Sequence, residues 1–257
     1  MSMQLSFIFL YIIAFLFGIV IGSFLNVCIY RLPLHENIAI TGSHCMSCGH
    51  RLAWFDLVPL FSWMLLGGKC RYCKVKLSVQ YPLIEGLNGI GYVLIFMVNG
   101  SCVDSIVLCL FFSALLVVSV LDWRTYEIPI GVNITILVLG ITRTSVDYIH
   151  IAEHLIGLIC VSLFLLLLNL LTNGRTMGGG DVKLMAAAGL LLGWKQIVLA
   201  LWLGCIIGSV IHLCLMKFAG RGRKLALGPY LSVGMIIAML WGDALIQWYM
   251  GAGSRIL

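Results

Sequence analysis

Long runs of apolar residues, separated by short polar segments, dominate the chain. Six runs approach the roughly 20 residues that an α-helix needs to cross a membrane, and they lie at 5–30, 82–98, 102–121, 155–171, 184–203 and 229–250. Two shorter runs at 128–141 and 200–216, with the polar breaks beside them, raise the expected number of spanning helices to about eight. The pattern predicts an all-α polytopic membrane protein.

The composition agrees with this pattern and adds an orientation. Hydrophobic residues make up 61% of the 257 residues and charged residues only 10%, which does not suit a soluble domain. The first run has no basic residue before it and no cleavage site after it, so we expect a retained helix with its N-terminus outside. If the loops then alternate, one side holds thirteen Lys and Arg residues and the other side three. The net charge of +6 therefore reports a cytoplasmic bias of basic loops rather than nucleic-acid binding.

The loop at 31–81 is the only sizeable polar segment, and it contains two C-x-x-C pairs. Cys45 and Cys48 form the first pair, and Cys70 and Cys73 form the second pair after 21 intervening residues. Four thiolates in this arrangement suit a tetrahedral structural zinc ion, which would hold together a loop too small to build its own core. Glycines after the first pair and before the second would supply tight turns. A redox-active dithiol pair is the alternative.

Two aspartates lie at the ends of apolar runs on the side expected to be cytoplasmic. Asp181 follows glycines at 178–180, which would let a second backbone approach the acid, although the acid could also simply cap a helix. Asp122 lies in a short polar turn and could instead pair with Arg124. Two facing carboxyls can share one proton, so that one activates water while the other protonates the leaving group, as in aspartic proteases. Glu127 is a competing partner carboxylate.

Several motifs follow one another in a fixed order over nearly the whole chain. They are GSFLNV at 22–27 with YRLP at 30–33, the two C-x-x-C pairs, YPLIE at 81–85, Asp122 with Ile128-Pro129, GGGDVKL at 178–184 and Gly228-Pro229. Together these motifs resemble those of bacterial type IV prepilin peptidases, which are membrane aspartyl proteases of the GxGD type. The order of several independent motifs is far more specific than a single G-x-G-D.

The resemblance implies an enzyme with two activities. Members of this family cut the short basic leader from type IV prepilins or pseudopilins on the cytoplasmic side, after a glycine. Many then methylate the new N-terminal amine with S-adenosylmethionine. The resemblance also implies that Asp122 and Asp181 are catalytic, that Gly178 and Gly180 let the substrate backbone lie beside Asp181, and that the four loop cysteines bind zinc.

The implied organisation has three parts in the bacterial cytoplasmic (inner) membrane. A first transmembrane helix at 1–30 precedes a cytoplasmic zinc-binding loop domain at 31–81, associated with methyl transfer, and a membrane-embedded aspartyl peptidase domain at 82–257. Lys183 is a candidate substrate contact, or else an anchor at the membrane interface. Glu85, one turn into the second span, is either a polar group of the methyl-transfer or substrate site or a structural partner inside the bundle.

Some features depart from the family pattern or leave other functions open. The family often has an arginine where this chain has Gln80, and no glycine-rich Rossmann fingerprint is present, so methyl transfer rests on the resemblance alone. A peptidase without methyltransferase activity is therefore one alternative. A membrane thiol oxidoreductase that uses the C-x-x-C pairs is another. A transporter would show an internal repeat, and the sequence contains no convincing one.

Overall fold

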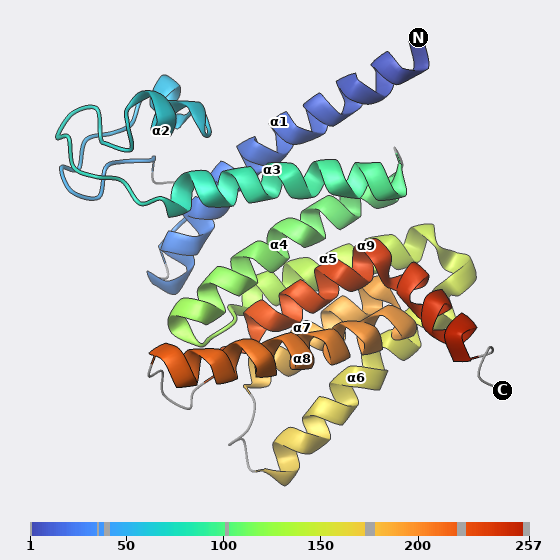
Figure 1. Cartoon of the computed structure of the whole chain (residues 1–257). Coiled ribbons are helices and arrows are strands. Elements are labelled where there is room, and N and C mark those ends of the chain that lie inside the picture. Colours follow the sequence, from blue (N-terminus) through green and yellow to red (C-terminus); the bar gives the residue numbers. More distant parts are fainter. Residues whose placement is uncertain are drawn as a thin grey trace. The chain divides into compact units, whose positions relative to one another are not determined.

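The structure is a computed structural model that describes residues 2–34, 36–38, 42–100, 103–172, 178–219 and 225–253. Helices dominate these residues, as the apolar pattern predicts. The longer α-helices are α1 (Ser2–Arg31), α3 (Gln80–Asn99), α4 (Val103–Thr125), α5 (Ile130–Val146), α6 (Ile151–Leu171), α7 (Gly179–Leu192), α8 (Trp194–Ala219) and α9 (Gly228–Gly253) (Figure 1). The short elements are η1 (Leu32–Leu34), η2 (Trp54–Leu57), α2 (Phe61–Leu65) and η3 (Tyr148–His150).

Six helices of the described chain are long and apolar enough to cross a membrane, namely α1, α3, α4, α6, α8 and α9. Helix α5 is a shorter apolar helix of 17 residues, and α7 has 14 residues. The prediction of an all-α polytopic membrane protein is confirmed. The described residues therefore contain six candidate spans, or seven if the shorter helix α5 also crosses, which is fewer than the expected number of about eight.

The predicted division of the apolar runs near residue 194 was wrong. The sequence pattern gave runs at 184–203 and 200–216, whereas α7 ends at Leu192 and α8 begins at Trp194. Gly193 separates the two helices because its φ of 82° lies in the left-handed region, which ends a helix at little cost only for glycine. The polar residues Lys195 and Gln196 mark a break in hydropathy here, but the predicted run at 184–203 was continued through them.

The chain divides into two compact units, Met1–Val117 and Val118–Leu257, and α4 begins in the first and ends in the second. In the first unit α1 packs closely on α3. A Cβ atom added to Gly18 would lie 2.6 Å from the Cα of Gly89, and one added to Gly22 would lie 2.7 Å from the Cα of Glu85. The small residues at 18 and 22 therefore allow the two backbones to touch, as their spacing predicts.

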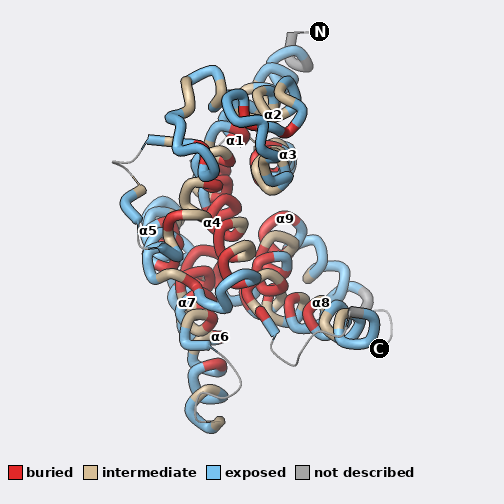
Figure 2. The backbone as a smooth tube through the Cα atoms, turned by 90° about the vertical axis from the view of Figure 1, so that its left-hand side faces the viewer, coloured by how far each residue is buried: buried red, intermediate tan, exposed pale blue. Residues whose placement is uncertain are grey.

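Helix α7 forms much of the core of the second unit, and nine of its 14 residues are buried (Figure 2). Gly189 of α7 faces Gly157 of α6 so closely that a Cβ atom on either glycine would overlap the backbone of the other helix. This close packing fixes the depth and rotation of α7 against α6.

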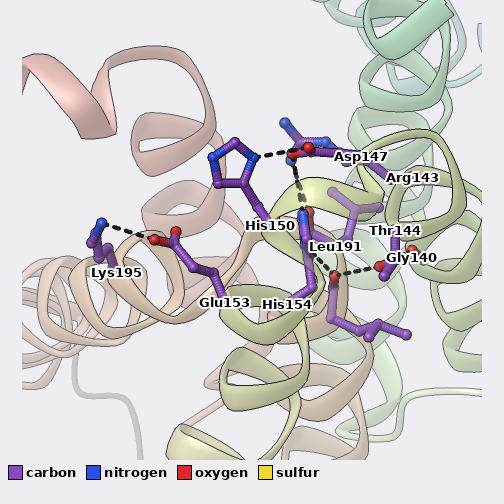
Figure 3. A network of polar contacts seen from close by, with 10 residues as sticks. Gly140, Arg143, Thr144, Asp147, His150, Glu153, His154, Leu191 and Lys195 are labelled. Atoms are coloured by element: carbon purple, nitrogen blue, oxygen red, sulfur yellow. Dashed lines mark hydrogen bonds and ion pairs between the residues drawn. The ribbon is translucent and has the colours of Figure 1, made fainter.

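The C-terminal end of α7 is anchored by polar side chains from two neighbouring helices (Figure 3). His154 of α6 places its Nδ1 2.8 Å from the carbonyl oxygen of Leu190, and Thr144 of α5 donates to the same oxygen at 3.4 Å. Arg143 donates from Nη1 to the carbonyl oxygen of Leu191 at 2.8 Å. These contacts satisfy carbonyls that a helix end leaves without intrahelical partners. They also hold the position of α7 along its own axis.

Candidate functional site

Asp122 lies in the last turn of α4, with 5% of its surface exposed. Its Oδ2 accepts a hydrogen bond of 2.7 Å from the backbone N–H of Gly228, the first residue of α9. The first N–H groups of a helix have no intrahelical acceptor, and the helix dipole is positive at this end. The carboxylate form of Asp122 is therefore stabilised by the start of α9.

Gly228 has no room for a side chain. A Cβ atom at this position would lie 2.8 Å from Oδ2 of Asp122 and 2.9 Å from its Cβ, which is closer than real contacts allow. The sequence pointed to Gly228 only as part of a Gly-Pro motif, and its contact with an acid 106 residues earlier was missed. The only sequence signal at this position was a glycine next to a proline, which indicates the start of a helix but not a contact with Asp122.

Asp181 lies in the first turn of α7 and is 8% exposed. Its Oδ1 is buried and has no hydrogen-bond partner among the described residues. The carboxyl groups of Asp181 and Asp122 interact electrostatically, whereas Glu127 is exposed. The structure thus brings together the two aspartates and does not favour Glu127 as the partner. Two like charges that interact in a buried site cannot both form easily, so one carboxyl of the pair is suited to hold a proton while the other is ionised.

The glycines before Asp181 adopt backbone conformations that other residues could also adopt. Gly178, the N-cap of α7, has φ −73° and ψ 142°, and Gly180 is helical. A Cβ atom on Gly180 would lie 3.3 Å from the Cβ of Ile128, whereas one on Gly179 would have no atom within 4 Å. Gly180 therefore lets the segment that follows α4 pack against the start of α7. A role of Gly178 and Gly180 in substrate approach stays a prediction.

Lys183 is exposed on α7. It follows Asp181 by two positions, and helix side chains two positions apart do not face each other. Lys183 is therefore not part of the aspartate pair. Its predicted contact with the substrate remains a prediction.

The four loop cysteines converge in the first unit, and all four are free thiols. Their Sγ atoms all lie within 4.8 Å of one another, and Cys45 and Cys73 are 3.8 Å apart. A tetrahedron with Zn–S bonds of about 2.3 Å has S···S edges of about 3.8 Å. Hydrogen bonds from the backbone N–H groups of Cys48 and Ser47 lower the pKa of the Cys45 thiol to about 6, which favours the thiolate that binds metal. The donor set fits a structural zinc ion.

The two cysteine pairs form equivalent turns. The N–H of Gly49 donates to the carbonyl of Cys45 at 2.8 Å, and the N–H of Lys74 donates to the carbonyl of Cys70 at 3.1 Å. Gly49 and Lys74 both have left-handed φ values, 68° and 60°. The sequence predicted the glycine turn, but Lys74 takes the same conformation without the freedom of glycine. Because all four Sγ atoms lie within 4.8 Å of one another, the two turns present their thiols to one common position.

The purified protein is expected to contain about one tightly bound zinc ion per chain, because four clustered thiols complete a tetrahedral site. Cys70→Ser should lose most of this zinc, whereas Cys160→Ser, which changes an exposed cysteine of α6, should retain it. Elemental analysis gives the stoichiometry, and mass spectrometry after alkylation gives the number of protected thiols. Four readily alkylated loop thiols, or two disulfides in protein purified under reducing conditions, would contradict a zinc site.

Comparisons with known proteins match both units. The profile described as "Bacterial Peptidase A24 N-terminal domain" matches residues 16–99, and that described as "Type IV leader peptidase family" matches residues 109–213. The chain is 32% identical over 267 residues to a "Prepilin leader peptidase/N-methyltransferase" of Pseudomonas putida, covering 90% of each sequence. It is 30% identical over 270 residues to the protein of that name in Aeromonas salmonicida (strain A449), covering 93% of each. The chain belongs to the bacterial type IV leader peptidase family.

A Legionella pneumophila relative with the same name is 29% identical over 274 residues and covers 95% of each sequence. No solved structure matches the chain. Within the type IV leader peptidase family, the N-terminal profile spans the cysteine cluster, and the peptidase profile spans Asp122 and Asp181. The peptidase profile ends before Gly228, so the donor to Asp122 lies outside the matched segment although Asp122 lies within it. As a member of this bacterial family with six candidate spans among its described residues, the chain is a multi-pass bacterial membrane protein.

Proposed function

We propose that this chain is a bifunctional prepilin leader peptidase and N-methyltransferase. It cleaves the leader of type IV prepilins or pseudopilins after a glycine, and it methylates the new N-terminal residue. The observation that carries the peptidase half is the pair of buried, interacting carboxyls of Asp122 and Asp181 in a helical membrane unit. Full-length similarity to relatives named for both activities supports the complete assignment.

The two carboxyls take different roles in the cleavage mechanism. Asp122 accepts the N–H of Gly228 and is the ionised base that removes a proton from the attacking water. Asp181, whose Oδ1 has no partner among the described residues, holds the shared proton. It donates this proton to the carbonyl oxygen of the scissile peptide, and the proton taken from water then passes to the leaving amine. The bond that breaks follows the last leader glycine.

The active site faces the cytoplasm in this proposal, with the N-terminus of the chain outside. The thirteen-to-three distribution of basic residues supports this orientation. The count comes from the sequence, and several of these residues lie outside the described part of the structure: Arg175, Arg221, Arg223, Lys224 and Arg255. The basic leader of the substrate then lies in the cytoplasm, and its apolar helix lies in the membrane. Gly178, Gly180 and Lys183 contact the substrate near the cleaved bond.

Both proposed cofactors belong to the methyl-transfer activity. The four loop cysteines hold a structural zinc ion that stabilises the loop at 31–81, which we associate with methyl transfer. S-Adenosylmethionine supplies the methyl group for the new N-terminal amine. The peptidase domain, at 82–257, carries both aspartates, and the first transmembrane helix, at 1–30, precedes the loop.

Coexpression with a type IV prepilin in bacteria that lack their own leader peptidase tests the proposed function. We expect the substrate to lose its leader after the glycine, and its new N-terminus to gain about 14 Da, the mass of one methylene. Intact-mass and N-terminal peptide mass spectrometry measure both changes in one sample. An uncleaved substrate would overturn the peptidase assignment, and a cleaved but unmodified amine would leave the chain a peptidase only.

A further inference from the structure

The first unit contains a cavity of about 450 Å³, within the usual range for a small-molecule site. Its walls come from the end of α1, the start of α3 and the loop that carries the cysteine cluster. Asn26, Tyr30, Trp63, Tyr81 and Glu85 are among the residues that line it. The cavity belongs to the part of the chain that matches the N-terminal profile and does not include either aspartate of the peptidase pair.

Glu85 is the buried acid of this cavity, and only 6% of its surface is exposed. Its Oε2 accepts the backbone N–H of Leu60 at 2.8 Å, and the hydroxyl of Ser23 donates to the same carboxylate. Within the described part of the chain, no basic side chain pairs with Glu85. The cavity is also lined by Arg31, Arg71 and Lys76. Arg71 pairs with Asp56 at 2.7 Å, and Arg31 donates to the backbone carbonyls of residues 37, 38 and 42. A buried acid without a cationic partner is costly in a membrane protein and favours a positively charged ligand.

The N–H that Glu85 accepts belongs to Leu60, whose backbone is strained. Leu60 has φ 60° and ψ −54°, and the N–H of Phe61 donates to the carbonyl of Pro59 at 2.6 Å. These values describe the rare form of γ-turn, which is strained for a residue with a branched side chain. Strain of this kind persists where the surrounding structure enforces it, and such positions cluster at ligand sites.

The cavity also presents aromatic groups. The rings of Tyr30 and Tyr81 stack with centroids 5.5 Å apart and planes 17° apart. The Nε1 of Trp63 is buried and has no acceptor among the described residues. Stacked rings suit a flat heteroaromatic ligand, and an indole N–H can donate to a ring nitrogen or a carboxylate of that ligand. Aromatic faces also attract cations.

We propose that this cavity is the binding site for S-adenosylmethionine, with Glu85 as its anionic anchor. The ligand combines a purine ring with a sulphonium cation, and the cavity combines aromatic rings with an acid that has no cationic partner among the described residues. The inference deepens the proposed methyltransferase function and rests on it. The methyl-donor site then belongs to the first unit, whereas both aspartates that cleave the substrate belong to the second.

In this proposal Glu85 also stabilises charge during the methyl-transfer reaction. The lone pair of the new N-terminal amine forms the N–C bond to the methyl carbon, and the C–S bond breaks with its electron pair left on sulphur. The product is a secondary ammonium, which releases its extra proton to water. Glu85 stabilises the positive charge on the reacting groups, first on the donor and then on the ammonium product.

The test measures equilibrium binding to the purified full-length enzyme by isothermal titration calorimetry. Two ligands are compared: S-adenosylmethionine, and S-adenosylhomocysteine, which lacks the sulphonium charge. Glu85→Gln keeps an oxygen acceptor for the N–H of Leu60 but removes the negative charge. We expect it to weaken S-adenosylmethionine binding about ten-fold or more and S-adenosylhomocysteine binding much less. Tyr30→Leu should weaken both ligands, because it removes part of the aromatic stack.

Glu153→Gln is the matched control, because it makes the same change at a half-buried residue that pairs with Lys195 in the second unit. It should leave both affinities unchanged. Prepilin cleavage by the wild-type preparation separates this inference from the proposed function. A Glu85→Gln enzyme that cleaves and binds S-adenosylmethionine as tightly as the wild type would overturn the inference. A wild-type enzyme that does not cleave would instead overturn the proposed function.

Discussion

Asp122→Asn and Asp181→Asn are each expected to reduce leader cleavage by about a thousand-fold or more, because an amide can neither accept the proton of the attacking water nor donate one to the scissile carbonyl. Each variant leaves one carboxyl in place, and one carboxyl cannot act as both acid and base within the same step. The initial rate of cleavage of a purified prepilin, followed by mass spectrometry, measures the effect. Wild-type activity in either variant would rule out the aspartate pair.

Both substitutions are expected to leave the protein folded. In the Asp122→Asn variant the oxygen of the new amide can still accept the N–H of Gly228, and Oδ1 of Asp181 has no partner among the described residues to lose. Asp243→Asn is the control, because Asp243 is an exposed acid of α9 whose Oδ1 accepts from Gln196 at 3.2 Å. Methylation of a substrate that has already been cleaved gives a second check of folding, since it does not need the aspartates.

Gly228→Ala is expected to lower kcat for cleavage by about a hundred-fold, with KM nearly unchanged. The new Cβ atom would lie 2.8 Å from Oδ2 of Asp122, so the acid or the start of α9 must move. Displacement of a catalytic group by about 1 Å can cost two orders of magnitude in rate. Steady-state kinetics on a prepilin peptide separate the two constants.

Gly131→Ala provides the comparison for this variant, because a Cβ atom on Gly131 in the first turn of α5 meets no atom within 4 Å. It should cleave at the wild-type rate. If Gly228→Ala did so as well, the N–H of Gly228 would have no part in positioning Asp122. If it instead raised KM and left kcat unchanged, the start of α9 would act on substrate binding rather than on the acid.

The features that local sequence pattern could predict are those that depend on spacing along one element. The glycines at 18 and 22 lie four residues apart on α1, so they share a helix face and predict close packing. The cysteine pairs predict a common site because each pair is itself a compact turn. Asp122 and Asp181 could be predicted to form a pair because both lie on the same predicted side of the membrane. The resemblance to a known family supported this prediction.

The features that the sequence did not reveal depend on contacts between distant segments. Gly228 donates to an acid 106 residues earlier, and Leu60 donates to an acid 25 residues later. Both donors are backbone N–H groups, which every residue except proline carries, so residue type gives no signal. The helix break at Gly193 is also not revealed by residue type. A glycine ends a helix there because its φ is left-handed, and the sequence does not show the φ value.

The contact between Asp122 and α9 means that the two aspartates are synthesised before the residue that positions one of them. During synthesis, α4 and α7 are made before residue 228, so both acids are present while the donor that fixes Asp122 does not yet exist. A growing chain at this stage has the carboxyls of a protease without the arrangement that makes them reactive. Under the proposed function, formation of the last helix is therefore the step that completes the peptidase.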